Sequence, residues 1–363
     1  MDIKVVISGT RGQKPRPENE SELGFGQYFT DHMFKMDYRE GAGWFDPRIV
    51  PYGPLNLDPA AMIFHYNQEV FEGLKAYLMP DGGTALFRPD KNISRMNKSL
   101  RRMTMPEIDP GEYLKALKEL IWLERDWIPA SEGTALYVRP TAIATEAALG
   151  VRTAKEYLFY IILSPVGPFY KEGFNPTKIY VADEFIRSAR GGSGAAKTSG
   201  NYGPTLSAAN KAREKGFTQV LWLDAVEHKY IEEVGTSNIF FVIGDELVTP
   251  PTGGTILDGV TRDSVIQIAR HQGKIVSDRA ITIDEVIDGI TSGRVKEIFA
   301  SGTAAVISPV GLIGYREETY TINNGETGAV ARSLYEELTG IQSGHREDPF
   351  GWVVRINGSS DQT

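Results

Sequence analysis

A single lysine lies in a run of small residues near the middle of the chain. The stretch RSARGGSGAAKTSGNYGPTLSAANKAREKG, residues 187–216, surrounds Lys197 with glycine, serine, alanine and asparagine. Because such neighbours have little bulk, a planar ligand or a phosphate group can come close to the backbone. Lys197 is therefore a candidate phosphate clamp or covalent amine, and the alternative is an ordinary solvated loop lysine.

A nucleotide-binding loop is one possible use of this lysine. GGSGAAKT, residues 191–198, differs by one residue from the motif G-x-x-x-x-G-K-[ST], since Ala196 stands where a glycine should precede the lysine. The motif also requires a helix directly after it, whereas SGNYGP intervenes before TLSAANKAR. These departures disfavour a P-loop nucleotide-binding protein, which remains the alternative from a different functional class.

A covalent amine explains more of the surrounding sequence. A lysine that binds pyridoxal phosphate needs an acid for the pyridine nitrogen and a cradle for the phosphate. Glu233 lies in the apolar strand pattern IEEVGTSNIFF, where a carboxylate paired with a protonated ring nitrogen stays ionised. Gly259, Val260 and Thr261 begin an expected helix, whose first N–H groups favour an anion. Taken alone, Glu233 could equally face water at a strand edge, and the glycine could mark an ordinary helix start.

Composition narrows the functional classes. The net charge of −8 argues against nucleic acid and anionic membranes as partners. The chain has no cysteine, which excludes disulfides and thiolate metal sites, and its five histidines include no close pair, so no metal site is expected. The longest dense apolar run, YLFYIIL, has the length of a strand rather than of a membrane span. We expect a soluble, cytoplasmic protein.

The length of 363 residues and the apolar periodicity predict two domains of the α/β class. The segment 164–176, rich in proline, glycine and aromatic residues, is expected to link a domain of residues 1–163 to a domain of residues 177–363. In the first domain we expect antiparallel strands over 21–44 and 61–89, helices over 90–103 and 113–127, and strands over 134–144 and 156–165. In the second we expect strands over 178–185, 219–224, 230–250 and 295–306, and helices over 205–216, 260–273 and 327–340.

A set of segments in fixed order carries a family resemblance. The chain resembles the branched-chain amino acid aminotransferases, which are pyridoxal phosphate enzymes of fold type IV, almost from end to end. The segments are FGQYFTDHM, FHYNQEVFEGLKAY, RPDKNISRMNKSLRRM, LYVRPTAIATEAALGV, GGSGAAKTSGNYGP, VLWLD, EEVGTSNIFF, TPPTGGTILDGVTRDS and FASGTAAV. The resemblance implies a homodimer whose subunit has a small N-terminal α/β domain and a larger C-terminal domain with a barrel-like sheet.

The resemblance also implies a role for individual residues. Lys197 would be the Schiff-base lysine and the general acid/base, Tyr202 the partner of the ring oxygen, and Glu233 the partner of the pyridine nitrogen. The remaining cofactor-binding residues would be Arg95, Thr236, Leu257, Gly259, Val260, Thr261 and Thr303. The substrate-binding residues would be Phe25, Tyr66, Phe71, Tyr137, Arg139, Thr236, Thr303 and Ala304, with Leu149 and Val151 supplied by the other subunit.

The activity implied is a ping-pong transfer of the amino group between leucine, isoleucine or valine and 2-oxoglutarate. A D-amino acid aminotransferase or an aminodeoxychorismate lyase of the same fold type remains an alternative, and the aromatic residues of the substrate set could equally be core packing. In GTAAVISP the chain departs from the mammalian members, which carry a C-x-x-C pair where this chain has Ala305 and Ser308. We therefore expect no thiol-based redox control.

Overall fold

The computed structural model describes residues 1–7, 9, 14, 19–167 and 174–357. Its contacts divide the chain into two compact units. Unit 1 comprises Met1–Phe169, Ala196–Ser199 and Gly340–Thr363, and unit 2 comprises Tyr170–Ala195 and Gly200–Thr339. Each unit is described by itself.

Unit 1 is built on a largely antiparallel sheet. The strand order is β1-β3-β2-β8-β7-β5-β6-β18, and β4 pairs with β7. The long neighbours β7 and β8 are in register from Ala135↔Val166 to Ala144↔Tyr157. The strands are β1 (Lys4–Val5), β2 (His32–Arg39), β3 (Gly43–Pro51), β4 (Glu69–Phe71), β5 (Leu74–Leu78), β6 (Thr84–Phe87), β7 (Ala135–Ala144), β8 (Glu156–Val166) and β18 (Val353–Ile356).

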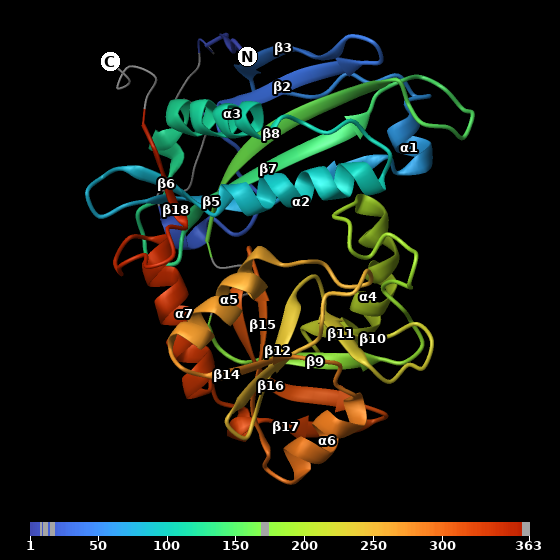
Figure 1. Cartoon of the computed structure of the whole chain (residues 1–363), viewed down its shortest axis with the longest axis vertical. Helices are drawn as coiled ribbons and strands as arrows, with labels where there is room; N and C mark the ends of the chain where they lie inside the picture. Colours follow the sequence, from blue (N-terminus) through green and yellow to red (C-terminus); the bar gives the residue numbers. More distant parts are fainter. Residues whose placement is uncertain (8, 10–13, 15–18, 168–173, 358–363) are drawn as a thin grey trace. The chain divides into compact units, whose positions relative to one another are not determined.

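Two helices, α2 (Pro89–Arg102) and α3 (Pro110–Leu123), lie across one face of this sheet (Figure 1). The apolar side chains of α2 recur at helical spacing, and Ile93, Met96 and Leu100 are buried in the core of unit 1. Asp109 caps α3 by accepting a hydrogen bond from the Glu112 N–H at 2.9 Å. The shorter elements are α1 (Met62–Tyr66), η1 (Glu20–Glu22) and η2 (Arg125–Trp127).

Unit 2 contains a mixed sheet with the order β11-β10-β9-β16-β15-β12-β13-β14, and β17 pairs with β16. The sheet curls, because the edge strand β11 is joined to β12, which lies further along the same sheet, by a short turn that the bridge between Val234 and Ser237 closes. The strands, rich in β-branched and aromatic residues, are β9 (Thr177–Ala182), β10 (Gln219–Leu223), β11 (Ile231–Val234), β12 (Asn238–Ile243), β13 (Glu246–Thr249), β14 (Ile275–Asp278), β15 (Val295–Gly302), β16 (Val306–Tyr315) and β17 (Glu318–Thr321).

The helices of unit 2 are attached by packing and by capping. In α6, which the sequence patterns did not predict, Ile283 and Val286 join the core of the curled sheet. The Glu297 carboxylate on β15 accepts the N–H groups of Val330 at 3.0 Å and Ala331 at 2.9 Å, which caps the start of α7. The helices are α4 (Leu206–Glu214), α5 (Val260–His271), α6 (Ile283–Thr291), α7 (Ala329–Gln342), η3 (Ser199–Asn201), η4 (Gly203–Thr205) and η5 (Asn323–Gly325).

The contact units differ from the predicted division in two places. Strand β18 pairs with β6, so the last part of the chain belongs to unit 1. Residues 196–199 also belong to unit 1, because the Phe71 N–H donates to the Lys197 carbonyl at 3.0 Å. Within the predicted linker 164–176, β8 extends to Val166, and residues 168–173 lie outside the described residues. The boundaries at 163 and 177 stay a prediction.

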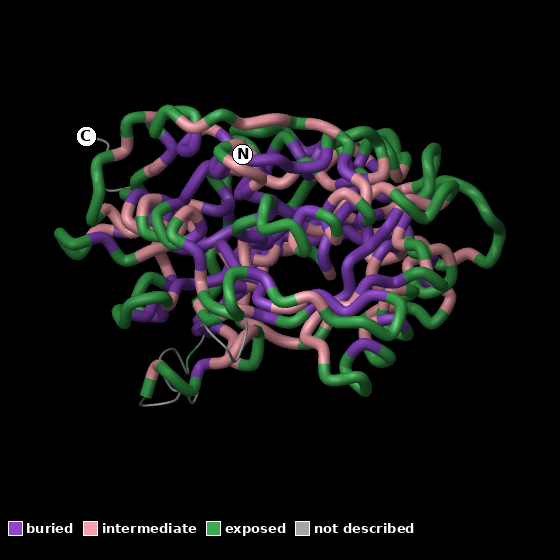
Figure 2. The backbone as a smooth tube through the Cα atoms, turned by 90° about the horizontal axis from the view of Figure 1, so that it is seen from below, coloured by how far each residue is buried: buried purple, intermediate pink, exposed green. Residues whose placement is uncertain are grey.

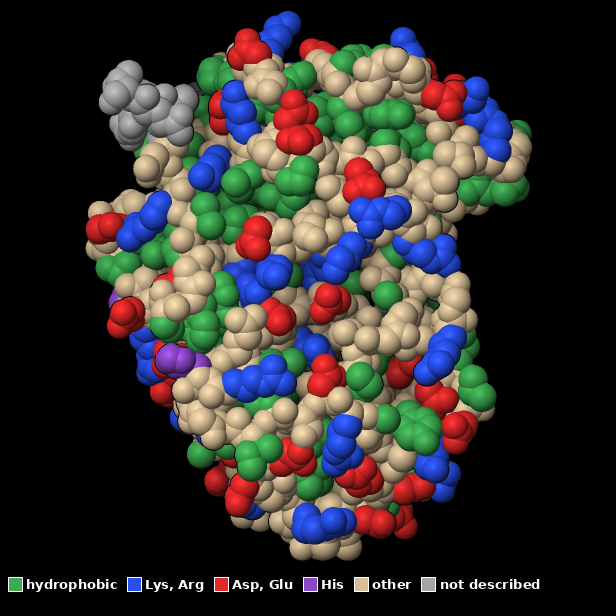
Figure 3. Space-filling model, viewed as in Figure 1, with side chains coloured by type: hydrophobic (Ala, Val, Ile, Leu, Met, Phe, Trp, Pro, Cys, Tyr) green, Lys and Arg blue, Asp and Glu red, His purple; other side chains and the backbone are tan. Residues whose placement is uncertain are grey.

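Burial and charge follow the pattern of a water-exposed surface over apolar cores. Figure 2 shows buried backbone in the interior and exposed residues in the peripheral loops. On the face drawn in Figure 3, acidic and basic side chains are interspersed rather than gathered into a field of one sign. Among the described residues, no helix is both long and apolar enough to cross a membrane.

Candidate active site

Lys197 is fixed by both of its backbone groups in unit 1. Its N–H donates to the Ser99 hydroxyl of α2 at 3.0 Å, and its carbonyl accepts from the Phe71 N–H at 3.0 Å. The Lys197 Nζ atom lies 5.1 Å from the centroid of the Phe71 ring. These two bonds fix the backbone from which the Lys197 side chain extends.

Beside this lysine, unit 1 buries a carboxylate that the sequence patterns did not single out. Glu72 is fully buried, and its oxygens receive Arg95 Nε at 2.7 Å and Arg95 Nη2 at 2.8 Å. Asn92 Nδ2 at 2.8 Å and the Gly73 N–H at 3.1 Å complete its partners. Burial by itself raises the pKa of Glu72, but the charges of Arg95 and Lys197 and these hydrogen bonds outweigh it and lower the pKa below its ordinary value. Glu72 thus holds Arg95, the predicted phosphate-binding arginine, in one orientation.

Four of the predicted substrate residues form one cluster in unit 1, which we call the aromatic wall: Phe25, Phe71, Tyr137 and Arg139. Phe25 meets Tyr137 edge to face, with 4.9 Å between ring centroids. The Arg139 guanidinium lies 4.8 Å from the centroid of Phe71, and its Nη2 donates to the Tyr137 hydroxyl at 3.3 Å. A Cβ atom on Gly73 would lie 2.0 Å from the Tyr137 hydroxyl oxygen, so only glycine leaves room for this phenol.

Tyr66 lies elsewhere in unit 1, at the end of α1. Its hydroxyl donates to the Leu149 carbonyl, in the turn that carries the residues predicted to act in the other subunit. Leu149 is 67% exposed and Val151 is 85% exposed. Phe64, also on α1, is 61% exposed. We call the two exposed apolar side chains of this turn, Leu149 and Val151, the 149–151 surface.

In unit 2, Glu233 is buried at the end of β11 and held by three neighbours. Its Oε1 atom accepts from the Leu257 N–H at 2.9 Å and from Asn238 Nδ2 at 3.3 Å. Its Oε2 atom forms an ion pair with Arg187 Nε at 3.0 Å, and both side chains are less than a tenth exposed. Such pairing keeps a buried carboxylate ionised. Arg187 and Asn238 are further residues that the sequence patterns missed, although Arg187 opens the stretch that drew attention to Lys197.

The predicted phosphate residues of unit 2 lie at the start of α5 and at two turns. Gly259 caps α5, and a Cβ atom there would lie 2.0 Å from Asn238 Oδ1. Val260 and Thr261 form the first turn, where helical N–H groups have no intrahelical partners. Because Asn238 pairs with Ser301, the turn containing Thr236 and the turn containing Thr303 and Ala304 lie at the same end of neighbouring strands. Tyr202 directly precedes η4.

Several buried hydroxyls suit a polar ligand. The oxygens of Thr198, next to Lys197, and of Ser301, at the end of β15, are buried and have no hydrogen-bond partner within the described chain. Such groups cost free energy unless a ligand or water satisfies them. Within unit 1 the lysine amine, Arg95 and Thr198, and within unit 2 Arg187, Ser301 and the α5 N-terminus, are donor groups whose chemistry suits parts of pyridoxal phosphate.

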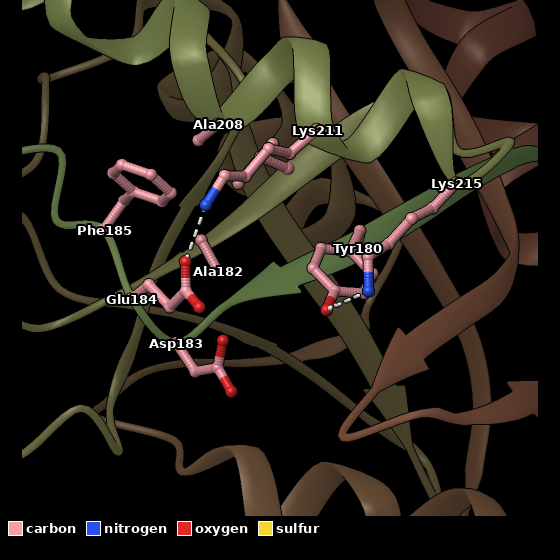
Figure 4. A pocket seen from close by; sticks show the side chains of 9 residues that line it. Tyr180, Ala182, Asp183, Glu184, Phe185, Ala208, Lys211 and Lys215 are labelled. Atoms are coloured by element: carbon pink, nitrogen blue, oxygen red, sulfur yellow. Dashed lines mark hydrogen bonds and ion pairs between the residues drawn. The ribbon is translucent and has the colours of Figure 1, made fainter.

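A separate pocket of about 250 Å³ lies in unit 2 between α4 and the ends of β9 and β10 (Figure 4). Its two lysines are paired within the pocket, since Lys211 Nζ contacts Glu184 at 2.8 Å and Lys215 Nζ contacts the Tyr180 hydroxyl at 3.2 Å. None of the predicted site residues lines this pocket. It is therefore not part of the candidate active site.

Comparison with known proteins identifies the family. The family model of class IV amino-transferases matches residues 69–313. The chain is 54% identical over 354 residues to branched-chain-amino-acid aminotransferase 2 of Bacillus subtilis (strain 168), with 98% of this chain and 97% of that protein covered. It is 46% identical over 340 residues to the branched-chain-amino-acid aminotransferase of Mycobacterium tuberculosis (strain CDC 1551 / Oshkosh), with 92% of each covered.

Solved structures confirm the predicted fold. The crystal structure of the Escherichia coli branched-chain amino acid aminotransferase has a TM-score of 0.76 at 24% identity, covering 90% of this chain and 99% of that chain. The crystal structure of the Thermobaculum terrenum branched-chain amino acid aminotransferase in its PLP form has a TM-score of 0.73 at 21% identity, covering 92% of this chain and 100% of that chain. The mixed α/β class, with two sheets of which one is curled, is thus confirmed. The chain belongs to the branched-chain amino acid aminotransferases of the class IV aminotransferase family.

Proposed function

We propose that this protein is a pyridoxal 5'-phosphate-dependent transaminase that exchanges an amino group between leucine, isoleucine or valine and 2-oxoglutarate. One observation carries the proposal: in a chain half identical to such an enzyme, Lys197 is fixed at both backbone groups next to the buried Glu72–Arg95 pair. The other fold type IV activities are not favoured, because the curated relatives of about half identity are branched-chain enzymes.

The cofactor supplies an electron sink for the bonds at the substrate Cα. Lys197 would hold it through its amine and would carry a proton to and from the substrate Cα. Glu233, paired with Arg187, would keep a proton on the ring nitrogen. Arg95, oriented by the Glu72 fork, would bind the phosphate.

The other cofactor contacts come from turns and a helix start. Tyr202 would donate to the ring oxygen and Leu257 would pack on the ring. The residues at the start of α5 and at the two turns of unit 2 would hold the phosphate; these are Thr236, Gly259, Val260, Thr261 and Thr303. Their support is the α5 cap and the neighbouring turns described above.

The substrate contacts are the aromatic wall, Tyr66, Thr236, Thr303 and Ala304. Apolar ring faces accept a branched side chain, whereas the tyrosine hydroxyls and Arg139 accept the carboxylate of glutamate. One pocket can then serve both half-reactions.

The proposal includes a cytoplasmic homodimer. The exposed 149–151 surface supports the dimer, because apolar side chains as exposed as Leu149 and Val151 are typical of contact surfaces. Val151 would reach the substrate of the partner copy. Analytical ultracentrifugation of the active enzyme is expected to give the mass of a dimer, and a fully active monomer would contradict the idea.

The central test replaces Lys197 by alanine. Lys197→Ala should fold, should lack the near-visible absorbance of the covalently bound cofactor, and should transaminate isoleucine slower by several orders of magnitude. The matched control is Lys211→Ala, which removes a lysine from the pocket of Figure 4 and should leave absorbance and rate unchanged. Near-normal transamination by Lys197→Ala would refute the proposal.

A further inference from the structure

One ring of the aromatic wall lies in a loop whose backbone has little rigidity of its own. The loop, residues 24–30, precedes β2 and carries Phe25 between Gly24 and Gly26. Both glycines have left-handed backbone angles, with φ of 57° and 69°. Because glycine adopts many backbone conformations at similar free energy, these neighbours do not fix the Phe25 ring. Contacts elsewhere in unit 1 must therefore set how closely Phe25 approaches Tyr137.

The two ends of this loop are anchored beside β8. The Gly24 carbonyl accepts from the Gly167 N–H at 2.9 Å, and the Thr30 N–H donates to the Leu163 carbonyl at 3.2 Å. Leu163 lies within β8, and Gly167 directly follows it. These two bonds set where the loop begins and ends, whereas the course of the residues between them depends on further contacts.

Phe29, near the end of the loop, is stacked on a ring that the sheet holds. The centroid of the Phe29 ring lies 5.1 Å from that of Tyr52, with 11° between the two planes. Tyr52 directly follows β3, and its N–H donates to the Asp31 carbonyl at 2.8 Å, which continues the pairing of β3 with β2. The sheet thus fixes Tyr52, and the stack ties the loop to the sheet.

A lysine strengthens the same contact. Lys14 Nζ lies 4.1 Å from the centroid of the Tyr52 ring and donates to the Thr30 carbonyl at 2.7 Å. One ammonium group therefore joins the ring to the end of the loop, by a cation–π contact and a hydrogen bond. We call Lys14, Phe29 and Tyr52 the loop brace. All three residues belong to unit 1, as does the aromatic wall.

We propose that Tyr52 is a positioning residue for substrate selection, which fixes the loop through its stack with Phe29 and so holds Phe25 in the aromatic wall. The inference rests on the proposed function, in which this wall accepts the side chain of the amino acid. A wall whose ring is held in place accepts a branched aliphatic chain and excludes a bulkier aromatic one. When the loop brace is lost, Phe25 can move aside, and the wall discriminates less between the two.

The experiment compares two unreactive acids of different bulk. 4-Methylpentanoate has a branched aliphatic end, and 3-phenylpropanoate has an aromatic ring. Their dissociation constants are measured by calorimetry on the cofactor-loaded enzyme. Loss of folded protein lowers the number of binding sites rather than their affinity, so a purely structural role of Tyr52 would not change the ratio of the two constants.

In the wild type, the branched acid should bind more tightly than the aromatic one. Tyr52→Leu should lower this preference about tenfold, and Phe25→Leu should lower it to a similar extent. If Tyr52 acts through Phe25, the double variant should be as selective as Phe25→Leu alone. Independent effects of the two substitutions would instead multiply to a loss of about a hundredfold.

Two further variants separate the brace from a general disturbance. Tyr52→Phe keeps the stacked ring and should therefore bind both acids as the wild type does. Tyr335→Leu, which removes a ring stacked on Phe174 at 4.1 Å in unit 2, is the matched control and should also keep the preference.

Two results overturn the inference. One is a preference of Tyr52→Leu equal to that of the wild type, and the other is a double variant in which the two losses multiply. If Tyr52→Leu fails to fold, Phe29→Leu, which removes the other ring of the stack, takes its place with the same outcomes. Either result in an enzyme that transaminates isoleucine refutes the role of Tyr52 alone, whereas a wild type without transamination refutes the proposed function.

Discussion

Two buried carboxylates, Glu72 in unit 1 and Glu233 in unit 2, each face an arginine, but they are bound in different ways. Glu72 receives both arms of the Arg95 fork, so that each of its oxygens balances the same cation. In Glu233 the Oε1 atom is held by the neutral donors of Leu257 and Asn238, and the Oε2 atom by Arg187. The first arrangement fixes an arginine, whereas the second fixes a carboxylate.

This difference suggests that Glu72 mainly stabilises the fold, whereas Glu233 mainly serves the reaction. A fork–fork pair is rigid and serves to orient its guanidinium, so its loss leaves an uncompensated buried charge. A carboxylate held by its neutral donors at one oxygen keeps its position even when its own charge is removed. Variants of Glu72 should therefore mainly lower the free energy of unfolding, and variants of Glu233 should mainly lower the rate of transamination.

The largest effect is expected for Glu72→Ala. It leaves Arg95 buried without its counter-ion, which should lower the free energy of unfolding by about 3–5 kcal/mol. Chemical denaturation of the cofactor-free protein measures this loss. The matched control is Glu107→Ala, which breaks an exposed fork with Arg101 and should barely move the denaturation midpoint.

The stabilising effect of the Glu72–Arg95 pair should also appear in how the free energy of unfolding depends on pH. The pKa of Glu72 is lowered in the folded state, so its stabilising contribution is present above the pKa of the unfolded chain, ~4.3. That contribution is lost as the pH falls through the lower, folded-state pKa. Below about pH 4 the wild type should therefore lose stability more steeply than Glu72→Gln. Two results would contradict the role given to Glu72. One is an equal loss of stability with falling pH in the wild type and Glu72→Gln, and the other is a denaturation midpoint of Glu72→Ala like that of the wild type.

For Glu233→Gln we expect the reverse signature. Arg187 loses its counter-ion in this variant, but the amide oxygen can still accept from the Leu257 N–H, so the unfolding free energy should change less than in Glu72→Ala. The rate should fall roughly a hundredfold, because a charge-assisted hydrogen bond of about 2–3 kcal/mol to the ring nitrogen is lost. Titration of the cofactor absorbance measures the weakened interaction with the ring nitrogen, and single-turnover rates measure the fall in rate. An unchanged rate would show that the ring nitrogen has another partner.

Sequence patterns predicted these two residues unequally, and the reason is physical. Glu233 drew attention because a carboxylate interrupts an apolar strand, a contrast that is visible locally. Glu72 carries no such contrast, and its importance comes from Arg95 and Asn92, which approach it across the fold.

The fold was predictable to the extent that local signals agreed with packing. The spacing of Ile93, Met96 and Leu100 predicted the helix observed as α2. Helix α6 was missed, although Thr282 and Glu285 have the spacing of a capping box and Thr282 Oγ1 accepts from the Glu285 N–H at 3.0 Å. The curl of the second sheet has no local signal, since it depends on pairings between distant segments such as β9 with β16.

The smallest effect concerns Arg139, whose Nη2 donates to the Tyr137 hydroxyl, and a variant there sharpens the comparison with the two glutamate sites. If Arg139 binds the distal carboxylate of glutamate, Arg139→Met should raise the barrier of the glutamate half-reaction by roughly 2 kcal/mol and leave the isoleucine half-reaction nearly unchanged. Single-turnover absorbance of cofactor conversion follows each half separately. If Arg139 instead only braces Phe71 and Tyr137, both halves should slow equally, because the same aromatic wall faces either substrate.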